Sequence, residues 1–119
     1  MLTLNDFKAA RSVLSGVILD THLVYSSAFS RATGNHVYLK PENMQVTGAY
    51  KIRGAYYKIS TLSEEEKSRG LVTASAGNHA QGVAYAAQHA GVPATIVMPT
   101  TTPLVKVNNT KDYGAHVVL

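Results

Sequence analysis

The fold of this chain is decided by the stretch LVTASAGNHAQG, residues 71–82, which passes from a strand pattern into a helix pattern. Residues 71–74 are a short apolar run, and the small residues of 75–77 form a turn. Residues 78–90 are rich in alanine and favour a helix, and Gly91 stands where a left-handed residue ends many helices. The stretch therefore predicts one strand–turn–helix unit.

The same alternation continues to residue 119. Residues 94–98 are apolar without a period of two, which is typical of a strand buried on both faces. Pro103 suits the first turn of a helix that runs to about residue 113, and residues 116–119 favour a further strand. This order predicts an α/β fold with a parallel three-layer βαβαβ unit. Because a buried-type strand is an unusual end for a domain, we expect the sequence to be the front portion of a longer protein.

The amino-terminal half carries weaker patterns. Leu4, Phe7, Ala10 (or Arg11) and Leu14 recur at helical spacing, which predicts a helix over residues 3–14 with one buried stripe. Four further elements are expected: a strand at 37–39, a loop at 41–48, a helix at 50–62, and a short helix from the capping box Ser63–Glu66 to Gly70.

Composition excludes several classes of protein. A chain of 119 residues that is 45% hydrophobic and 15% charged supports one small core. The net charge of +4 comes from scattered residues, which indicates a solvated surface and no nucleic-acid partner. The absence of cysteine excludes disulfides and thiolate chemistry and is compatible with the cytoplasm. The five histidines lack metal-ligand spacing, and no window approaches the roughly 18 apolar residues of a membrane span. We therefore expect no metal site and no membrane partner.

One lysine stands at a turn where a helix pattern starts, in the segment TGAYKIRGA, residues 47–55. A lysine amine becomes a nucleophile when desolvation or a nearby cation favours its neutral form. Lys51 lies between Tyr50 and Ile52, whose side chains offer such an apolar setting, and Gly48 allows the backbone to approach a flat ligand. The alternative is an ordinary solvated lysine on a helix.

The turn at residues 75–79 joins a parallel strand to a helix at the carboxyl end of the strand, where open α/β sheets bind ligands. Unpaired N–H groups at the helix start attract a carboxylate or a phosphate, and small side chains let the anion reach the backbone. Asn78 is placed to hydrogen-bond a phenolic oxygen. The alternative is an ordinary Ser/Asn helix cap.

Together these segments resemble the fold-type II pyridoxal-phosphate enzymes (tryptophan synthase β-like), and within them the threonine dehydratase, or threonine ammonia-lyase, group. The segment LKPENMQVTGAYKIRGA, residues 39–55, is similar to the cofactor-lysine segment of that family. The segment TASAGNHAQGVA, residues 73–84, is similar to its substrate loop and the helix that follows. Met98-Pro99 and residues 103–119 resemble the next βα unit. Two long motifs in the family's order make this resemblance specific.

The resemblance implies roles for seven residues. Lys51 would be the Schiff-base lysine and the proton carrier at the substrate Cα. Asn78 would contact the 3-hydroxyl of pyridoxal 5'-phosphate, and Tyr50 would pack near the cofactor in place of the usual phenylalanine, with Ala49 in place of the usual serine. The backbone of five residues would hold the substrate carboxylate: Ser75, Ala76, Gly77, Asn78 and His79.

The resemblance also implies an organisation for the whole enzyme. Residues 1–62 would begin the large cofactor domain and residues 63–119 the smaller mobile domain, with the phosphate-binding loop and the rest of both domains beyond residue 119. The activity would be dehydration and deamination of L-threonine, and of L-serine, to a 2-oxo acid and ammonia. We expect a cytoplasmic homo-oligomer when full length, in isoleucine biosynthesis or threonine catabolism.

Two other functions stay open at this stage. One is a serine racemase of the same fold, although racemases carry a second serine where this chain has Ala76, a residue without a titratable group. The other is an inactive fragment or a degenerate binding module. Retention of both Lys51 and Asn78 argues against decay but not against truncation, and we expect the 119-residue chain alone to be inactive.

Overall fold

The computed structural model describes all residues, 1–119. Its carboxyl-terminal part is a three-stranded parallel sheet in the order β3 (Leu71–Ala74), β4 (Ala94–Val97), β5 (His116–Val118). Helix α5 (Asn78–Ala90) connects β3 to β4, and α6 (Leu104–Asp112) connects β4 to β5. The predicted βαβαβ unit is confirmed, with element ends within two residues of those expected.

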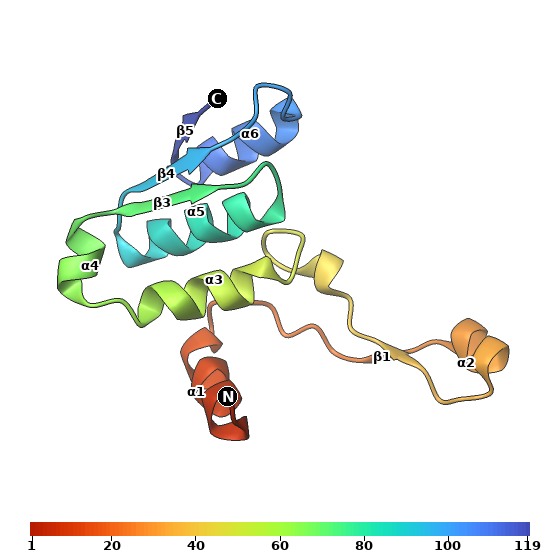
Figure 1. Cartoon of the computed structure of the whole chain (residues 1–119). Helices are drawn as coiled ribbons and strands as arrows, with labels where there is room; N and C mark the ends of the chain where they lie inside the picture. Colours follow the sequence, from red (N-terminus) through yellow and green to blue (C-terminus); the bar gives the residue numbers. More distant parts are fainter.

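Helix α5 is the centre of the molecule and lies between the sheet and α3 (Lys51–Ser60), which gives three layers (Figure 1). Its alanines pack on both sides: Ala80, Ala84 and Ala86 have no exposed surface. Ile96 of β4 and Ile52 of α3 are also fully buried. Small side chains in the middle layer let the two outer layers approach closely, because the distance between packed elements is set by the side chains at the contact.

The two faces of the sheet differ. Ile96 faces α5 and is fully buried, whereas Val72 is 78% exposed and Val97 is 41% exposed. The prediction that residues 94–98 form a strand buried on both faces is therefore wrong for the described chain. The helices α5 and α6 cover one face, and nothing in this chain covers the other.

Between α3 and the sheet, α4 (Glu64–Ser68) begins at the predicted capping box. The Ser63 backbone N–H donates to Glu66 Oε2 at 2.8 Å, and the Glu66 N–H donates to Ser63 Oγ at 3.2 Å. Gly70 then adopts a left-handed φ of 76°, which favours glycine and turns the chain into β3.

Helix α1 (Leu4–Leu14) was predicted, but its stripe is not buried as expected. Leu14 is buried against the rest of the chain, whereas Leu4 is 68% exposed and Phe7 is 61% exposed. The reason is that α3 is the main element against which α1 packs, and an open hollow of about 1130 Å³ lies beside the two helices. None of the helices combines the length and apolar character that a membrane crossing requires.

Residues 24–39 form an arm that reaches away from the three layers (Figure 1). Strand β1 (Val24–Tyr25) pairs antiparallel with β2 (Tyr38–Leu39), and α2 (Ser27–Thr33) connects them. The strand at 37–39 was predicted, but β1 and α2 were not, since two-residue strands leave no periodic pattern. The loop expected at 41–48 contains one 3₁₀ turn, η1 (Glu42–Met44).

Candidate active site

The lysine segment forms a tight turn that leads into α3. Gly48 adopts a left-handed φ of 69°, and its N–H donates to the Gln45 carbonyl at 2.7 Å. Tyr50 caps the helix and Lys51 is its first residue. A glycine is required at position 48 because other residues rarely adopt this conformation.

The Lys51 side chain is exposed, and its Nζ forms no hydrogen bond or ion pair. Its Nζ lies 5.3 Å from the centre of the Tyr50 ring, within the range of a cation–π contact. Ile52 turns away into the core and is fully buried. The expectation that both Tyr50 and Ile52 would shield the amine from water is therefore wrong for this chain, because only Tyr50 lies beside it.

The small-residue turn lies at the carboxyl end of β3, as predicted. The Ser75 N–H donates to the Val97 carbonyl of β4 at 3.0 Å, and the Gly77 N–H donates to Ser75 Oγ at 3.3 Å. Helix α5 starts at Asn78, so its first N–H groups have no partner inside the helix. Ala76, Asn78 and His79 are exposed. The turn thus presents backbone donors without bulky side chains.

Gly82 brings the lysine and the turn together. A Cβ at Gly82 would lie 3.2 Å from the Ile52 nitrogen and 3.2 Å from the Lys51 carbonyl carbon, so α5 touches the backbone of α3 at its first turn. Asn78 precedes Gly82 by four residues and shares its helix face. The two predicted halves of the site are therefore neighbours in space.

A groove of about 570 Å³ runs between α3, β3 and α5. Tyr50, Lys51 and His79 line it, whereas the turn residues 75–78 do not. The larger hollow beside α1 contains none of the predicted site residues. The groove is therefore the better candidate for a bound ligand near the lysine.

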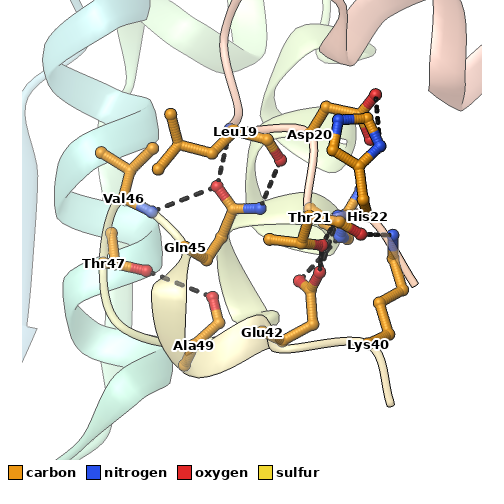
Figure 2. A network of polar contacts seen from close by, with 11 residues as sticks. Leu19, Asp20, Thr21, His22, Lys40, Glu42, Gln45, Val46, Thr47 and Ala49 are labelled. Atoms are coloured by element: carbon orange, nitrogen blue, oxygen red, sulfur yellow. Dashed lines mark hydrogen bonds and ion pairs between the residues drawn. The ribbon is translucent and has the colours of Figure 1, made fainter. Parts of the chain in front are cut away.

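A network of polar contacts anchors the start of α3, and Figure 2 shows most of it from close by. The Gln45 side chain is buried and pairs with the Leu19 backbone: Leu19 N–H donates to Oε1 and Nε2 donates to the Leu19 carbonyl, both at 2.9 Å. Lys40 Nζ donates to the Thr21 carbonyl at 2.6 Å. These contacts tie residues 19–21 to the loop that carries the lysine.

Glu42 and Arg53 form the charged part of this network. Arg53 Nε donates to Glu42 Oε2 at 2.8 Å and Arg53 Nη2 donates to Oε1 at 2.7 Å, and the Thr21 hydroxyl donates to Oε1 at 2.5 Å. The hydrogen bonds from Arg53, helped by those from Thr21 and by the Lys40 charge, lower the pKa of Glu42 to about 2. Sequence reasoning missed this pair, since 11 residues separate its members.

A second residue that sequence reasoning missed is Lys106, whose Nζ donates to Asn78 Oδ1 at 3.2 Å. A signal for it existed: β3 and β4 are parallel neighbours, so the first turns of α5 and α6 meet at the same edge of the sheet. Lys106 stands in that first turn of α6.

The residues at this site fit pyridoxal phosphate. Lys51 supplies an amine without any partner, Asn78 supplies an amide NH₂ group with no acceptor in the chain, and a groove adjoins the lysine. A flat aromatic ring would find Tyr50 beside that amine.

Comparison with known proteins agrees with this chemistry. The family described as pyridoxal-phosphate dependent enzyme matches residues 14–119. The chain is 59% identical over 119 residues to an L-threonine ammonia-lyase of Thermotoga maritima, and the match covers 100% of this chain and 30% of that protein. The chain therefore spans about a third of the length of the curated relatives it matches.

Solved structures of the same family superpose on nearly the whole chain. Serine racemase from Dictyostelium discoideum gives a TM-score of 0.92 at 40% identity and covers 98% of this chain and 38% of its own. Threonine deaminase isoform 2 from Solanum lycopersicum gives a TM-score of 0.81 at 40% identity and covers 99% of this chain and 34% of its own. The fold is thus shared by proteins that are named for two different reactions.

Proposed function

This chain belongs to the pyridoxal-phosphate dependent enzymes, and on that premise we propose that it is the amino-terminal part of a longer ammonia-lyase that converts L-threonine, and L-serine, to a 2-oxo acid and ammonia. The observation that supports the proposal is the close approach of Gly82 to the backbone of Lys51 and Ile52, which packs the first turn of α5 against the start of α3. Residues 1–62 would begin the cofactor domain and residues 63–119 the smaller domain.

The cofactor, when bound, supplies an electron-withdrawing ring that stabilises negative charge at the substrate Cα. Lys51 Nζ would hold the cofactor and then move the proton at that Cα. The N–H groups of residues 75–79 would bind the substrate carboxylate, since the start of α5 carries partial positive charge. Asn78 would donate to the 3-hydroxyl, and the Tyr50 ring would restrict water at one side of Lys51. In the net reaction the β-hydroxyl leaves as water, and a water is taken up when the C–N bond is hydrolysed.

The second candidate is a serine racemase, which the match to the Dictyostelium discoideum enzyme favours. Racemisation needs a proton donor on the face of Cα opposite to Lys51. Ala76 has no such group, so this position leaves the second face without a donor, and elimination is preferred.

The lysine assignment is tested in the full-length enzyme that carries this segment. Borohydride reduction followed by peptide mass spectrometry should find the cofactor attached to Lys51. Lys51→Ala should lose both the near-visible absorption band and α-proton exchange. Lys111→Ala, at an exposed lysine of α6 that does not line the groove, is the control and should keep both. A reducible band that survives in Lys51→Ala would mean that another amine holds the cofactor.

The reaction type is tested with the same protein. L-threonine and L-serine should yield ammonia and a 2-oxo acid, with little D-amino acid by chiral chromatography. If D-serine forms faster than ammonia, the racemase alternative replaces this proposal.

The 119-residue chain alone should not turn over threonine. One face of its sheet is open, with Val72 78% exposed, and a cofactor phosphate needs preorganised donors, which we propose come from parts of the longer enzyme outside this segment. Ammonia release with excess pyridoxal phosphate should not exceed that of the free cofactor, and sedimentation should detect association. Stereospecific turnover by the monomeric chain would contradict this.

Cellular location and assembly complete the proposal. A chain without cysteine is compatible with the reducing cytoplasm, and we expect the full-length enzyme to form a homo-oligomer there. Cell fractionation and sedimentation of the full-length enzyme check both points. A biosynthetic and a catabolic role are equally compatible with this segment.

A further inference from the structure

Lys106 lies beside the proposed cofactor contact without an ion-pair partner of its own. Its Nζ donates to Asn78 Oδ1 at 3.2 Å, and this is the one side-chain hydrogen bond it makes. The first turns of α5 and α6 contain no acidic residue, so no carboxylate competes for the ammonium group from either helix.

The core of the molecule fixes the position of Lys106. Its neighbour Val107 is 4% exposed, and Thr110, one turn further, is fully buried. The Thr110 hydroxyl donates to the Lys106 carbonyl at 2.8 Å, and the Lys106 N–H donates to the Pro103 carbonyl at 2.9 Å. Lys106 is half-buried, and its ammonium group lies at the start of α5.

The chemistry of the pair determines how Asn78 is oriented. An ammonium group only donates hydrogen bonds, so the atom that faces Lys106 must be the amide oxygen. The amide NH₂ group of Asn78 then points away from Lys106 and has no acceptor within the chain. The positive charge of Lys106 beside the amide oxygen also polarises the amide group of Asn78, which strengthens its N–H donors.

We propose that Lys106 is a positioning residue that fixes the Asn78 amide, so that its NH₂ group donates to the 3-oxygen of the cofactor. The inference rests on the proposed function, because it assumes that Asn78 meets that oxygen. It adds a residue on α6 to a site that the sequence motifs assign to α3 and α5 alone.

The test compares two cofactors in the full-length apoenzyme: pyridoxal phosphate, and the analogue that lacks the 3-hydroxyl group. Lys106→Met should weaken the equilibrium affinity for pyridoxal phosphate about tenfold, as expected for one charge-assisted hydrogen bond. Its affinity for the analogue should equal that of the wild type, because the analogue offers no oxygen to the amide. Asn78→Ala should give the same selective loss.

Two further variants separate positioning from packing. Lys106→Arg keeps a donor-only cation and should restore most of the affinity for pyridoxal phosphate. Lys111→Met removes a lysine from the same helix that contacts no site residue, and it should change neither affinity. An equal loss for both cofactors in Lys106→Met, or no loss for either, would overturn the inference while leaving the role of Lys51 intact. A wild-type enzyme that does not bind pyridoxal phosphate would overturn the proposed function and the inference together.

Discussion

The two ends of this chain are held together by different forces. From α3 onward, twelve buried apolar residues between Ala55 and Ala115 form one continuous core. The first 40 residues add Leu14 to the buried apolar side chains, and they attach to the segment at 41–53 through the polar network of Gln45, Glu42 and Arg53. The difference teaches that the part from α3 onward is held by an apolar core on one face of its sheet, whereas the amino-terminal part is docked mainly by hydrogen bonds and one charge pair.

The largest expected effect on stability comes from truncating one large apolar side chain in each part of the chain. Ile96→Ala removes a fully buried side chain between the sheet and α5, and it should lower the free energy of unfolding by about 3 kcal/mol. Phe7→Ala removes an aromatic ring that is 61% exposed, and it should cost less than about 1 kcal/mol. Urea unfolding followed by circular dichroism checks both. Similar losses for the two variants would show that α1 is buried more than the contrast allows.

The next largest loss of stability is expected from a substitution at the close contact between α3 and α5. Gly82→Val places new methyl groups against the Lys51 and Ile52 backbone, 3.2 Å from the expected Cβ, and should destabilise by about 2 kcal/mol. Gly54→Ala is the matched control, since a Cβ there meets nothing within 4 Å and alanine favours the helix by up to about 1 kcal/mol. Thermal unfolding should therefore shift down for the first variant and up for the second.

The charge pair that docks the amino-terminal part should depend on pH. Glu42 has its pKa lowered from 4.5 to about 2 by Arg53, so its stabilisation is fully present above about pH 4.5 and is lost as the pH falls toward 2. Glu42→Gln should lower the free energy of unfolding by about 1–1.5 kcal/mol at pH 6. The value is modest because the Arg53 side chain is 30% exposed.

The difference in the free energy of unfolding between the wild type and Glu42→Gln should fall to zero between about pH 4.5 and about pH 2. A series of urea unfolding curves measures this difference. Glu65→Gln is the control: its partner Arg69 is 68% exposed, and its stability gap should be close to zero at every pH. A gap for Glu42→Gln that is constant with pH would mean that the lost contact is not electrostatic.

The smallest expected effect on stability comes from the capping box, which occurs once in each part of the chain. Ser63→Ala removes the cap of α4, which joins α3 to the sheet, and should cost about 0.5–1 kcal/mol of global stability. Thr3 and Asp6 form the corresponding box at α1, where the Thr3 N–H donates to Asp6 Oδ2 at 2.6 Å. Thr3→Ala should speed hydrogen exchange in the first turn of α1 and leave global stability unchanged within about 0.3 kcal/mol. A global loss from Thr3→Ala would place α1 inside the cooperative unit.

The contrast also explains what the sequence predicts well. From Leu71 to the last strand, each apolar run and each glycine acts on its near neighbours, so the pattern determines the order and bounds of the elements. The arm at residues 24–39 was missed because β1 pairs with β2 across 15 residues and each strand is only two residues long.

The site divides in the same way. Lys51 and the turn at residues 75–79 belong to contiguous motifs, and their neighbourhood followed from the family resemblance. The Gln45–Leu19 pairing spans 26 residues and the Lys106–Asn78 bond spans 28, so neither leaves a local signal. Contacts between side chains on different elements depend on packing, which periodicity alone does not specify.

The alanines of α5 have a consequence for how related sequences can diverge. At Ala80, Ala84 and Ala87, which are at most 2% exposed, the constraint is on volume and not on polarity, because this helix separates the sheet from α3. Serine or glycine should be tolerated there, whereas a branched side chain would push α3, which carries Lys51, away from α5. The exposed position Gln88 carries no such limit. Mutational drift can therefore change the exposed face of α5, whereas these three buried positions must keep small side chains so that the sheet and α3 stay at their present spacing.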